Sequence, residues 1–165
     1  MRASILTIIL LCINSWSFGQ TETQTCYATV TSIFSYSISN PVANLNLSTI
    51  NEVKNGKISA NFSTISVKSN KNWQMSVRAQ SPTFSLLSLL GLGGQPLPST
   101  ALKIKPSSGG GWKDLTTSDV VLKSGNKGDA TKPGNTFDVD VKFQPGLTSK
   151  GGIYTLGLIY TLTQP

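Results

Sequence analysis

Paired carboxylates are the first candidates for chemistry in this sequence. The chain contains no histidine, which removes Ser–His–Asp and Cys–His catalysis and the commonest transition-metal ligand. Asp138 and Asp140 are two positions apart, so on a strand their carboxylates share one face at roughly 6.5–7 Å. A glycosidase needs two carboxylates that face each other across a cleft. Because Lys142 continues the same row, we interpret it as a solvated polar face and expect no enzyme.

The stretch from Gly125 to Asp129 loosely resembles a calcium-binding loop. It lacks the alternating acids and the terminal glutamate that such a loop uses to surround the ion. No Gly-rich phosphate cradle occurs in a strand–helix context. We therefore interpret this stretch as a turn and expect neither a metal ion nor a cofactor.

Trp112 is the aromatic residue best placed to contact a ligand. It follows the three glycines Gly109–Gly111, in a predicted loop, and an exposed aromatic ring can stack on a sugar. Trp112 and the adjacent Lys113 are therefore candidates for contact with a glycan or another partner. The alternative is that Trp112 folds back over the edge of the core, since tryptophan is mostly buried on average.

An apolar segment from Phe84 to Gly94 has no clear secondary-structure pattern and can be a short helix, a strand or a loop. One interpretation is that it plugs an open end of the core. Another is that it forms an exposed patch that contacts a second subunit, and a third is contact with a membrane. The candidate interface consists of its large side chains, Phe84, Leu86, Leu87, Leu89 and Leu90.

The elements that must position these residues are predicted to be strands. Ser, Thr, Gly, Asn and Pro punctuate the chain about every 8 to 12 residues, and β-branched residues fill the spaces between them. This composition predicts an all-β fold, an immunoglobulin-like antiparallel β-sandwich of about seven to nine strands. Strands are expected near Cys26–Ile33 and Phe34–Ser39, and Asn55-Gly56 predicts a tight turn.

Three segments show the side-chain alternation of a strand. The first carries the apolar residues Phe137, Val139, Val141 and Phe143 on a single face. In the second, Trp73, Met75 and Val77 share a face. The last strand is expected to span Ile153–Thr163 and to contribute much of the burial, through Tyr154, Leu156, Leu158, Tyr160 and Leu162.

The N-terminus has the order of features typical of a secretory signal peptide. Arg2 precedes an apolar stretch, and Ser17-Phe18-Gly19 is a small-x-small cleavage pattern. The apolar stretch is too short to span a membrane, which needs roughly 20 residues. We expect residues 1–19 to be removed, leaving a single β-sandwich domain over residues 20–165 with no membrane span.

The charge of the chain bears on its partners. The formal net charge is +7, and it becomes +6 when Arg2 is removed with the leader. The lysines are spread along the chain, which indicates either a solvated basic surface or attraction to an anionic polymer such as cell-surface polysaccharide. Nucleic acid is a poor fit, because there is no basic helix and no interleaving of basic and aromatic residues.

Cys26 is the only cysteine that remains after removal of the leader. An intramolecular disulfide is therefore impossible, and the fold must hold by its apolar core. Cys26 either pairs between chains or stays reduced inside a strand, and we expect it to be a buried small apolar residue.

The sequence Ser69–Val77, with Trp73 and Met75, resembles the strand-entry motif of bacterial WxL-type surface domains. The C-terminal run resembles the closing strand of the same proteins, through Tyr154, Leu158, Tyr160 and Leu162. This chain has Met75 where the family has leucine and Tyr160 where it has tryptophan. The resemblance implies a secreted β-sandwich that attaches non-covalently to the cell wall. A broader resemblance is to fimbrial and spore-coat-like secreted sandwiches, whose last strand also alternates.

Taken together, these patterns favour an exported structural or adhesion module of the bacterial cell envelope or cell surface. Two alternatives remain open: a non-catalytic module that binds glycan or cell wall, and a pilus or fimbrial subunit that assembles through its strands. Partners are expected to be surface polysaccharide or other surface proteins, and a homo-oligomer is possible. The expected location is the cell surface, the medium or the periplasm.

Overall fold

The computed structural model describes residues 26–40, 44–87 and 96–165. The chain divides into two compact units, Met1–Val30 and Thr31–Pro165. In the first unit only residues 26–30 are described; they form no strand, and their side chains are exposed. The leader predicted for residues 1–19 lies outside the described residues. The remainder of this subsection concerns the second unit.

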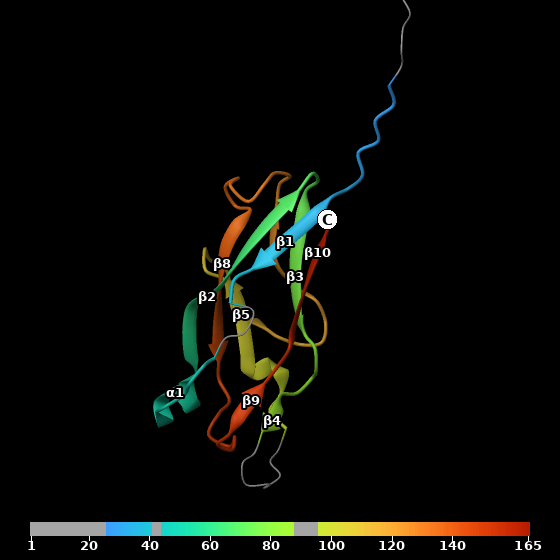
Figure 1. Cartoon of the computed structure of the whole chain (residues 1–165). Coiled ribbons are helices and arrows are strands. Elements are labelled where there is room, and N and C mark those ends of the chain that lie inside the picture. The colour runs from blue at the N-terminus through green and yellow to red at the C-terminus, as the bar shows by residue number, and fades with distance from the viewer. Residues whose placement is uncertain (1–25, 41–43, 88–95) are drawn as a thin grey trace, which may run out of the picture. The chain divides into compact units, whose positions relative to one another are not determined.

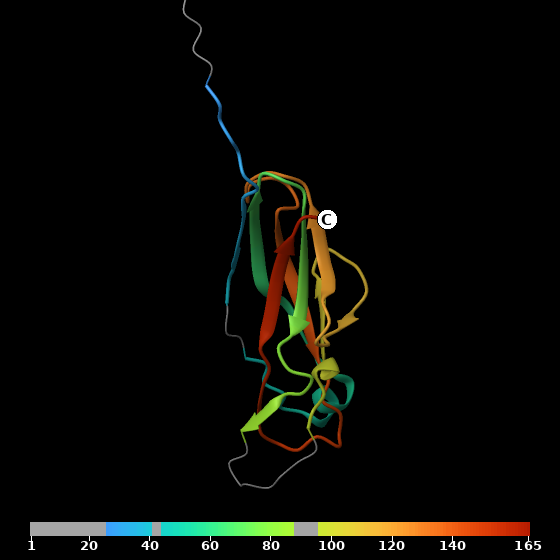
Figure 2. The ribbon, with the colours of Figure 1, turned by 90° about the vertical axis from the view of Figure 1, so that its right-hand side faces the viewer.

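The second unit is built almost entirely from antiparallel strands, which Figures 1 and 2 show from two sides. A five-stranded sheet has the order β1-β2-β8-β5-β6, a three-stranded sheet the order β10-β3-β7, and a two-stranded sheet pairs β4 with β9. The described elements are, in chain order, β1 (Phe34–Ile38), α1 (Ile50–Asn55), β2 (Lys57–Ser69), β3 (Trp73–Ala79), β4 (Ser85–Leu87), the 3-10 turn η1 (Ser99–Ala101), β5 (Leu102–Pro106), β6 (Lys113–Asp114), β7 (Val120–Gly125), β8 (Thr136–Phe143), β9 (Ile153–Thr155) and β10 (Leu158–Thr163).

The two larger sheets contribute to one apolar core. The side chains predicted to share a face in β3 and in β8 are all buried, which confirms both predicted strands. The Trp73 ring of β3 stacks on the Phe137 ring of β8, with centroids 6.2 Å apart and planes 12° apart. This contact joins the three-stranded sheet to the five-stranded sheet. Around it lie the other buried members of the core, Ile65, Val67, Met75, Val77, Leu97, Ala101, Leu102, Ile104, Leu115, Leu122, Val139, Val141 and Phe143.

A bulge in β2 lengthens this strand relative to β8. The four residue steps from Ser59 to Ser63 lie opposite the two steps from Val141 to Val139, and Asn61 within this stretch has a φ of 50°, a left-handed conformation that asparagine tolerates better than most residues. Because the register shifts by two residues, the alternation of side chains is the same before and after the bulge. Ile58 lies opposite Lys142 and is exposed, whereas Ile65 lies opposite Phe137 and is completely buried.

The predicted strand over Cys26–Ile33 is wrong. The described structure has no strand there, and pairing begins at Phe34, opposite Ser69 of β2. Cys26 is exposed, so the expectation of a buried cysteine is also wrong. A β-branched composition alone does not make a strand, because the backbone needs a neighbouring strand to hydrogen-bond.

The predicted turn at Asn55-Gly56 is the end of a helix that composition did not indicate. Thr49 and Glu52 form a capping box: the Thr49 hydroxyl accepts from the Glu52 backbone N–H, and the Glu52 carboxylate accepts from the Thr49 N–H. A hydrogen bond from the Ser48 backbone N–H and one from Lys57 lower the pKa of Glu52 to about 2. Gly56 closes α1 with a φ of 84°, which glycine adopts without strain.

The last predicted strand is two strands that belong to different sheets. β9 pairs with β4, and β10 pairs with β3. The break falls at Leu156-Gly157, where the backbone N–H of Gln80 donates to the Gly157 carbonyl at 2.8 Å. A Cβ on Gly157 would lie 3.2 Å from the Gln80 Cβ atom, which is a tight contact, so glycine eases the approach of the two segments here. The alternating apolar residues of this run pack against the core, but they are only half-buried.

Gly125 gives a direct test of the packing around Trp73. A Cβ at this position would lie 2.3 Å from Cζ2 of the fully buried Trp73 ring, and a buried ring cannot move aside. We expect Gly125→Ala to lower the free energy of unfolding by roughly 1–3 kcal/mol, measured by urea denaturation. The matched control is Gly111→Ala, where nothing lies within 4 Å of the added carbon. Equal stability of the two variants would contradict this packing.

Candidate functional site

Trp112 lies on a face that also carries lysines of the five-stranded sheet. Its ring is half-exposed, and the Lys105 ammonium of β5 lies over it, 5.2 Å from the ring centroid. This is the distance range of a cation–π interaction. The Lys105 Nζ atom is also 3.4 Å from a carboxylate oxygen of Asp140. The aromatic ring is thus held beside a positive charge, and its remaining exposed surface faces solvent.

Lys103 extends this face along β5. It is paired in register with Asp114, and its Nζ atom is 2.8 Å from the Asp114 carboxylate. Lys113 is paired with the buried Ile104, so it points to the opposite side of the sheet, where its ammonium donates to the backbone carbonyl of Val121 in β7. The structure therefore does not bring Trp112 and Lys113 together on one face. We name Lys103, Lys105 and Trp112 the basic aromatic face.

The row of polar residues on β8 is not uniformly solvated, contrary to the prediction. Asp140 is 7% exposed, and its carboxylate accepts from the backbone N–H of Asn61 at 3.0 Å and from the Ser107 hydroxyl. Burial alone would raise the pKa of Asp140, but these hydrogen bonds and the Lys105 charge outweigh it and hold the pKa below its usual range. β8 lies between β2 and β5, and Asn61 of β2 and Lys105 of β5 contact the Asp140 carboxylate from the two sides.

Asp138 does not join Asp140 in a shared site. Its carboxylate accepts a hydrogen bond of 2.6 Å from the Thr64 hydroxyl of β2. Each of the two carboxylates thus has its own structural partners.

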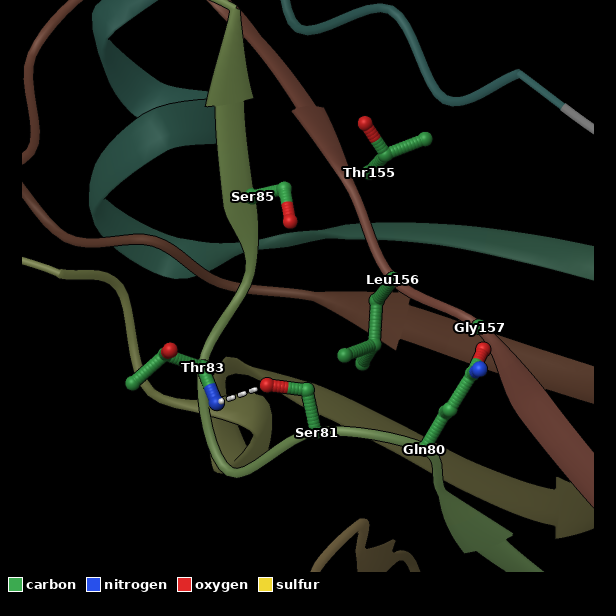
Figure 3. A pocket seen from close by; sticks show the side chains of 7 residues that line it. All are labelled: Gln80, Ser81, Thr83, Ser85, Thr155, Leu156 and Gly157. Atoms are coloured by element: carbon green, nitrogen blue, oxygen red, sulfur yellow. Dashed lines mark hydrogen bonds between the residues drawn. The ribbon is translucent and has the colours of Figure 1, made fainter.

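A polar hollow of about 360 Å³ lies where β3 leads into β4 and β9 leads into β10. Figure 3 shows the Gln80 side chain reaching toward Gly157 and the Ser81 hydroxyl accepting from the Thr83 backbone N–H, at 3.4 Å. The lining carries hydroxyl and amide groups and no charged side chain, so it suits hydrogen bonds to a neutral polar group. The residues that line it are Gln80, Ser81, Thr83, Ser85, Thr155, Leu156 and Gly157.

The candidate apolar interface is divided by the structure. Phe84 is half-buried and contacts Phe143, with ring centroids 5.3 Å apart, and Tyr154, with centroids 6.2 Å apart. Leu86 is half-buried in β4, and Leu87 ends this strand. Leu89 and Leu90 lie outside the described residues. Phe84 thus packs against the core.

The residues that carry the WxL resemblance lie in the buried strand β3 and in β9 and β10. Trp73 and Met75 are completely buried. Tyr154, Leu158, Tyr160 and Leu162 are half-buried and pack against the core cluster. The Tyr160 backbone carbonyl accepts from the Tyr36 hydroxyl at 3.1 Å, which links β10 to β1. Burial raises the pKa of Tyr160, because its ionised form would lose contact with water.

Asn135 is a structural residue that the sequence patterns did not indicate. It is 1% exposed, and its Oδ1 atom accepts from the Trp73 indole N–H at 3.1 Å. Its Nδ2 atom donates to the Asp129 carbonyl at 2.9 Å, and its own carbonyl accepts from Val67. The only sequence signal for this role is weak: Asn135 is a polar residue directly before the strand in which Phe137 begins the apolar alternation.

The Asp129 loop is a closed turn, as expected. The Asp129 carboxylate accepts from the Thr131 hydroxyl at 2.6 Å and from the Thr131 backbone N–H at 3.0 Å. These hydrogen bonds lower the pKa of Asp129. In the described parts of the chain, no three His, Cys, Asp or Glu side chains come together in a way that could hold a metal ion.

No helix in the described ranges combines the length and the apolar character needed to cross a bilayer. Comparisons of the chain with protein-family models and with curated proteins find no match.

Asp140 makes stability depend on pH, and this is testable. Because the folded-state pKa lies below the unfolded value of 3.8, ionised Asp140 stabilises the fold above that pH, and this contribution is lost as pH falls through the depressed value. We expect Asp140→Asn to lower the free energy of unfolding by about 1–3 kcal/mol at neutral pH. The difference from wild type should shrink between about pH 5 and about pH 2.

The measurement is urea denaturation across that pH range, and Asp119→Asn is the control. Asp119 is half-exposed in its 3.9 Å ion pair with Arg78, so its replacement should change stability by at most about 0.5 kcal/mol. A constant difference between wild type and Asp140→Asn at all pH values would contradict the role assigned to this carboxylate.

Proposed function

We propose that residues 20–165, released from the leader by cleavage after Gly19, form an exported adhesion module of the bacterial cell envelope. In this proposal the two larger sheets make an immunoglobulin-like sandwich, and the module binds an anionic surface polysaccharide without acting as an enzyme. The shared core of the two sheets supports the sandwich. The order of charge, apolar stretch and small residues at the N-terminus supports export.

The engagement of the acidic residues supports a non-catalytic role. Each of the six described Asp and Glu side chains has a partner within the fold: Glu52 caps α1, Asp114 pairs with Lys103, Asp119 with Arg78, Asp129 with Thr131, Asp138 with Thr64, and Asp140 with Lys105, Ser107 and Asn61. A general acid or base needs a carboxyl group free to reach a substrate proton. Here the carboxylates stabilise turns, a helix end and strand pairs.

The observation that carries the binding proposal is the position of Lys105 over the Trp112 ring. An aromatic ring provides a flat apolar surface for the C–H face of a sugar, and an adjacent ammonium provides the counter-charge for a carboxylate or phosphate on the polymer. Lys103 lies on the same face, in its ion pair with Asp114. The formal net charge of residues 20–165, which is +6 because Arg2 leaves with the leader, favours the encounter with an anionic polymer at long range.

The proposal is also consistent with the resemblance to WxL-type surface domains, which implies attachment to the cell wall. The buried positions of Trp73 and Met75 mean that these motif residues hold the fold together and leave the basic aromatic face as the contact with the wall. The partner is then an anionic wall polymer and not another protein.

The test is a pull-down of the purified protein with insoluble peptidoglycan that retains its anionic polymers. We expect Trp112→Ala to weaken binding by about tenfold or more, because the stacking surface is lost. Lys105→Gln should weaken binding and also reduce its dependence on salt, because one charge contact is removed.

The matched control is Lys54→Gln, which removes an exposed charge from α1 and should leave binding and its salt dependence unchanged. Circular dichroism confirms that each variant keeps its strands. If Trp112→Ala binds as well as wild type, the basic aromatic face is not the binding site. If wild type does not bind at all, the choice of polysaccharide is wrong.

A further inference from the structure

Four exposed lysines lie at one end of the second unit, although the chain separates them into two distant pairs. Lys68 and Lys71 lie where β2 turns into β3, and Lys127 and Lys132 lie in the connection from β7 to β8. Figures 1 and 2 show this turn and this connection at the same end of the second unit, opposite α1. We name these four lysines the basic end.

Hydrogen bonds hold the two segments of the basic end side by side. The Ser69 backbone N–H donates to the Gly128 carbonyl at 2.9 Å, and the Gly128 N–H donates to the Ser69 carbonyl at 2.7 Å. The Lys127 N–H donates to Asn72 Oδ1 at 3.2 Å, and the Lys132 ammonium donates to the Lys127 carbonyl at 2.7 Å. Lysines that are spread along the sequence thus form one cluster in the fold.

The positive charge of the basic end is not balanced by carboxylates. Within the described residues, none of its four ammonium groups forms an ion pair, whereas four other basic side chains do: Lys57, Arg78, Lys103 and Lys105. The only acid in the two segments is Asp129, and its carboxylate accepts from Thr131. Four lysines and one aspartate leave a local formal charge of +3, and such a concentration of one sign attracts anions.

Two side chains beside the basic end add to its character. Lys123 of β7 adds a fifth positive charge, with its ammonium 4.9 Å from the Phe137 ring centroid. Ile33 is 59% exposed, and it is fixed to the β2–β3 turn: its N–H donates to Asn70 Oδ1 at 2.9 Å, and its carbonyl accepts from the Asn70 N–H at 3.3 Å. An exposed apolar side chain therefore lies next to the lysines.

This composition favours phospholipid over polysaccharide as the anionic partner. Residues 68–72 and 123–135 contain no aromatic residue, so neither segment offers a ring that can stack on a sugar. A lysine ammonium is a compact point charge that attracts phosphate without requiring a fixed geometry. Clusters of about four to eight basic residues bind anionic lipid surfaces, and a neighbouring apolar side chain can enter the headgroup region.

We propose that the basic end is a peripheral binding surface for a bilayer that contains anionic phospholipids. The four ammonium groups lie against lipid phosphates, and the Ile33 side chain enters the boundary between headgroups and acyl chains. The Ser69–Gly128 hydrogen bonds make the two segments act as one contact. The basic end shares no residue with the basic aromatic face, so this inference goes beyond the proposed function and does not depend on it.

The test is co-sedimentation of protein, purified after expression from the full-length sequence, with vesicles of phosphatidylglycerol and phosphatidylcholine in equal parts. Wild type should bind these vesicles at least about tenfold more tightly than vesicles of phosphatidylcholine alone, and added salt should release it. The double variant Lys71→Gln/Lys127→Gln should bind the anionic vesicles about tenfold more weakly than wild type, because two phosphate contacts are lost. Both side chains are exposed, so the fold should be retained.

The matched control is Lys54→Gln/Arg78→Gln, which removes the same net charge from exposed positions outside the basic end and should bind the anionic vesicles like wild type. An effect of net charge alone would weaken the two double variants equally. Ile33→Ser should weaken binding but leave its salt dependence unchanged, because only an apolar contact is removed.

Several outcomes overturn the inference. Wild type that does not sediment with the anionic vesicles has no such surface, and equal binding to phosphatidylcholine vesicles shows that the lysines do not make the contact. Equal binding by the two double variants shows that the basic end is not the site. If Lys71→Gln/Lys127→Gln loses binding to peptidoglycan but not to vesicles, these lysines contact the polymer instead. Vesicle binding is measured without polysaccharide, so failure of the proposed function leaves this test intact.

Discussion

The contact between Trp73 and Phe137 is the interaction on which the rest of this structure depends. It joins a strand of the three-stranded sheet to a strand of the five-stranded sheet through stacked rings 6.2 Å apart. The indole N–H, which would be costly to bury without a partner, donates to Asn135 and to the Asn126 carbonyl. Gly125 leaves room for the ring. Aromatic burial, a satisfied polar group and a glycine are thus required together.

The polar interactions of the second unit also depend on close packing. Asp140 is covered by neighbours on both sides and keeps its charge because Asn61, Ser107 and Lys105 satisfy it. Lys105 also lies over Trp112, so one lysine connects the buried carboxylate to the exposed aromatic ring. The interior therefore holds the chain rigid, while the groups proposed to meet a partner lie on its surface. The proposed binding to a polysaccharide needs such a rigid framework and an accessible face.

Sequence patterns predicted the strands whose burial can be seen from the alternation of neighbouring residues. The alternation from Phe137 to Phe143 and the face of Trp73 are visible because each strand has one buried side along its length. The break at Gly157 was not predictable, since it depends on Gln80, which is distant in sequence. Likewise, the burial of Asp140 depends on the bulge at Asn61. The segment Cys26–Ile33 was predicted as a strand because its composition favours one, and composition does not reveal whether a neighbouring strand exists.

Hydrogen exchange of the Trp73 indole N–H, monitored by nuclear magnetic resonance, tests the central contact most directly. If the indole bridges the two sheets as described, this proton exchanges only when the whole second unit unfolds, and its opening free energy equals the global free energy of unfolding. Exchange within minutes under native conditions, with an opening free energy far below the global value, would show that the ring is not enclosed between the sheets.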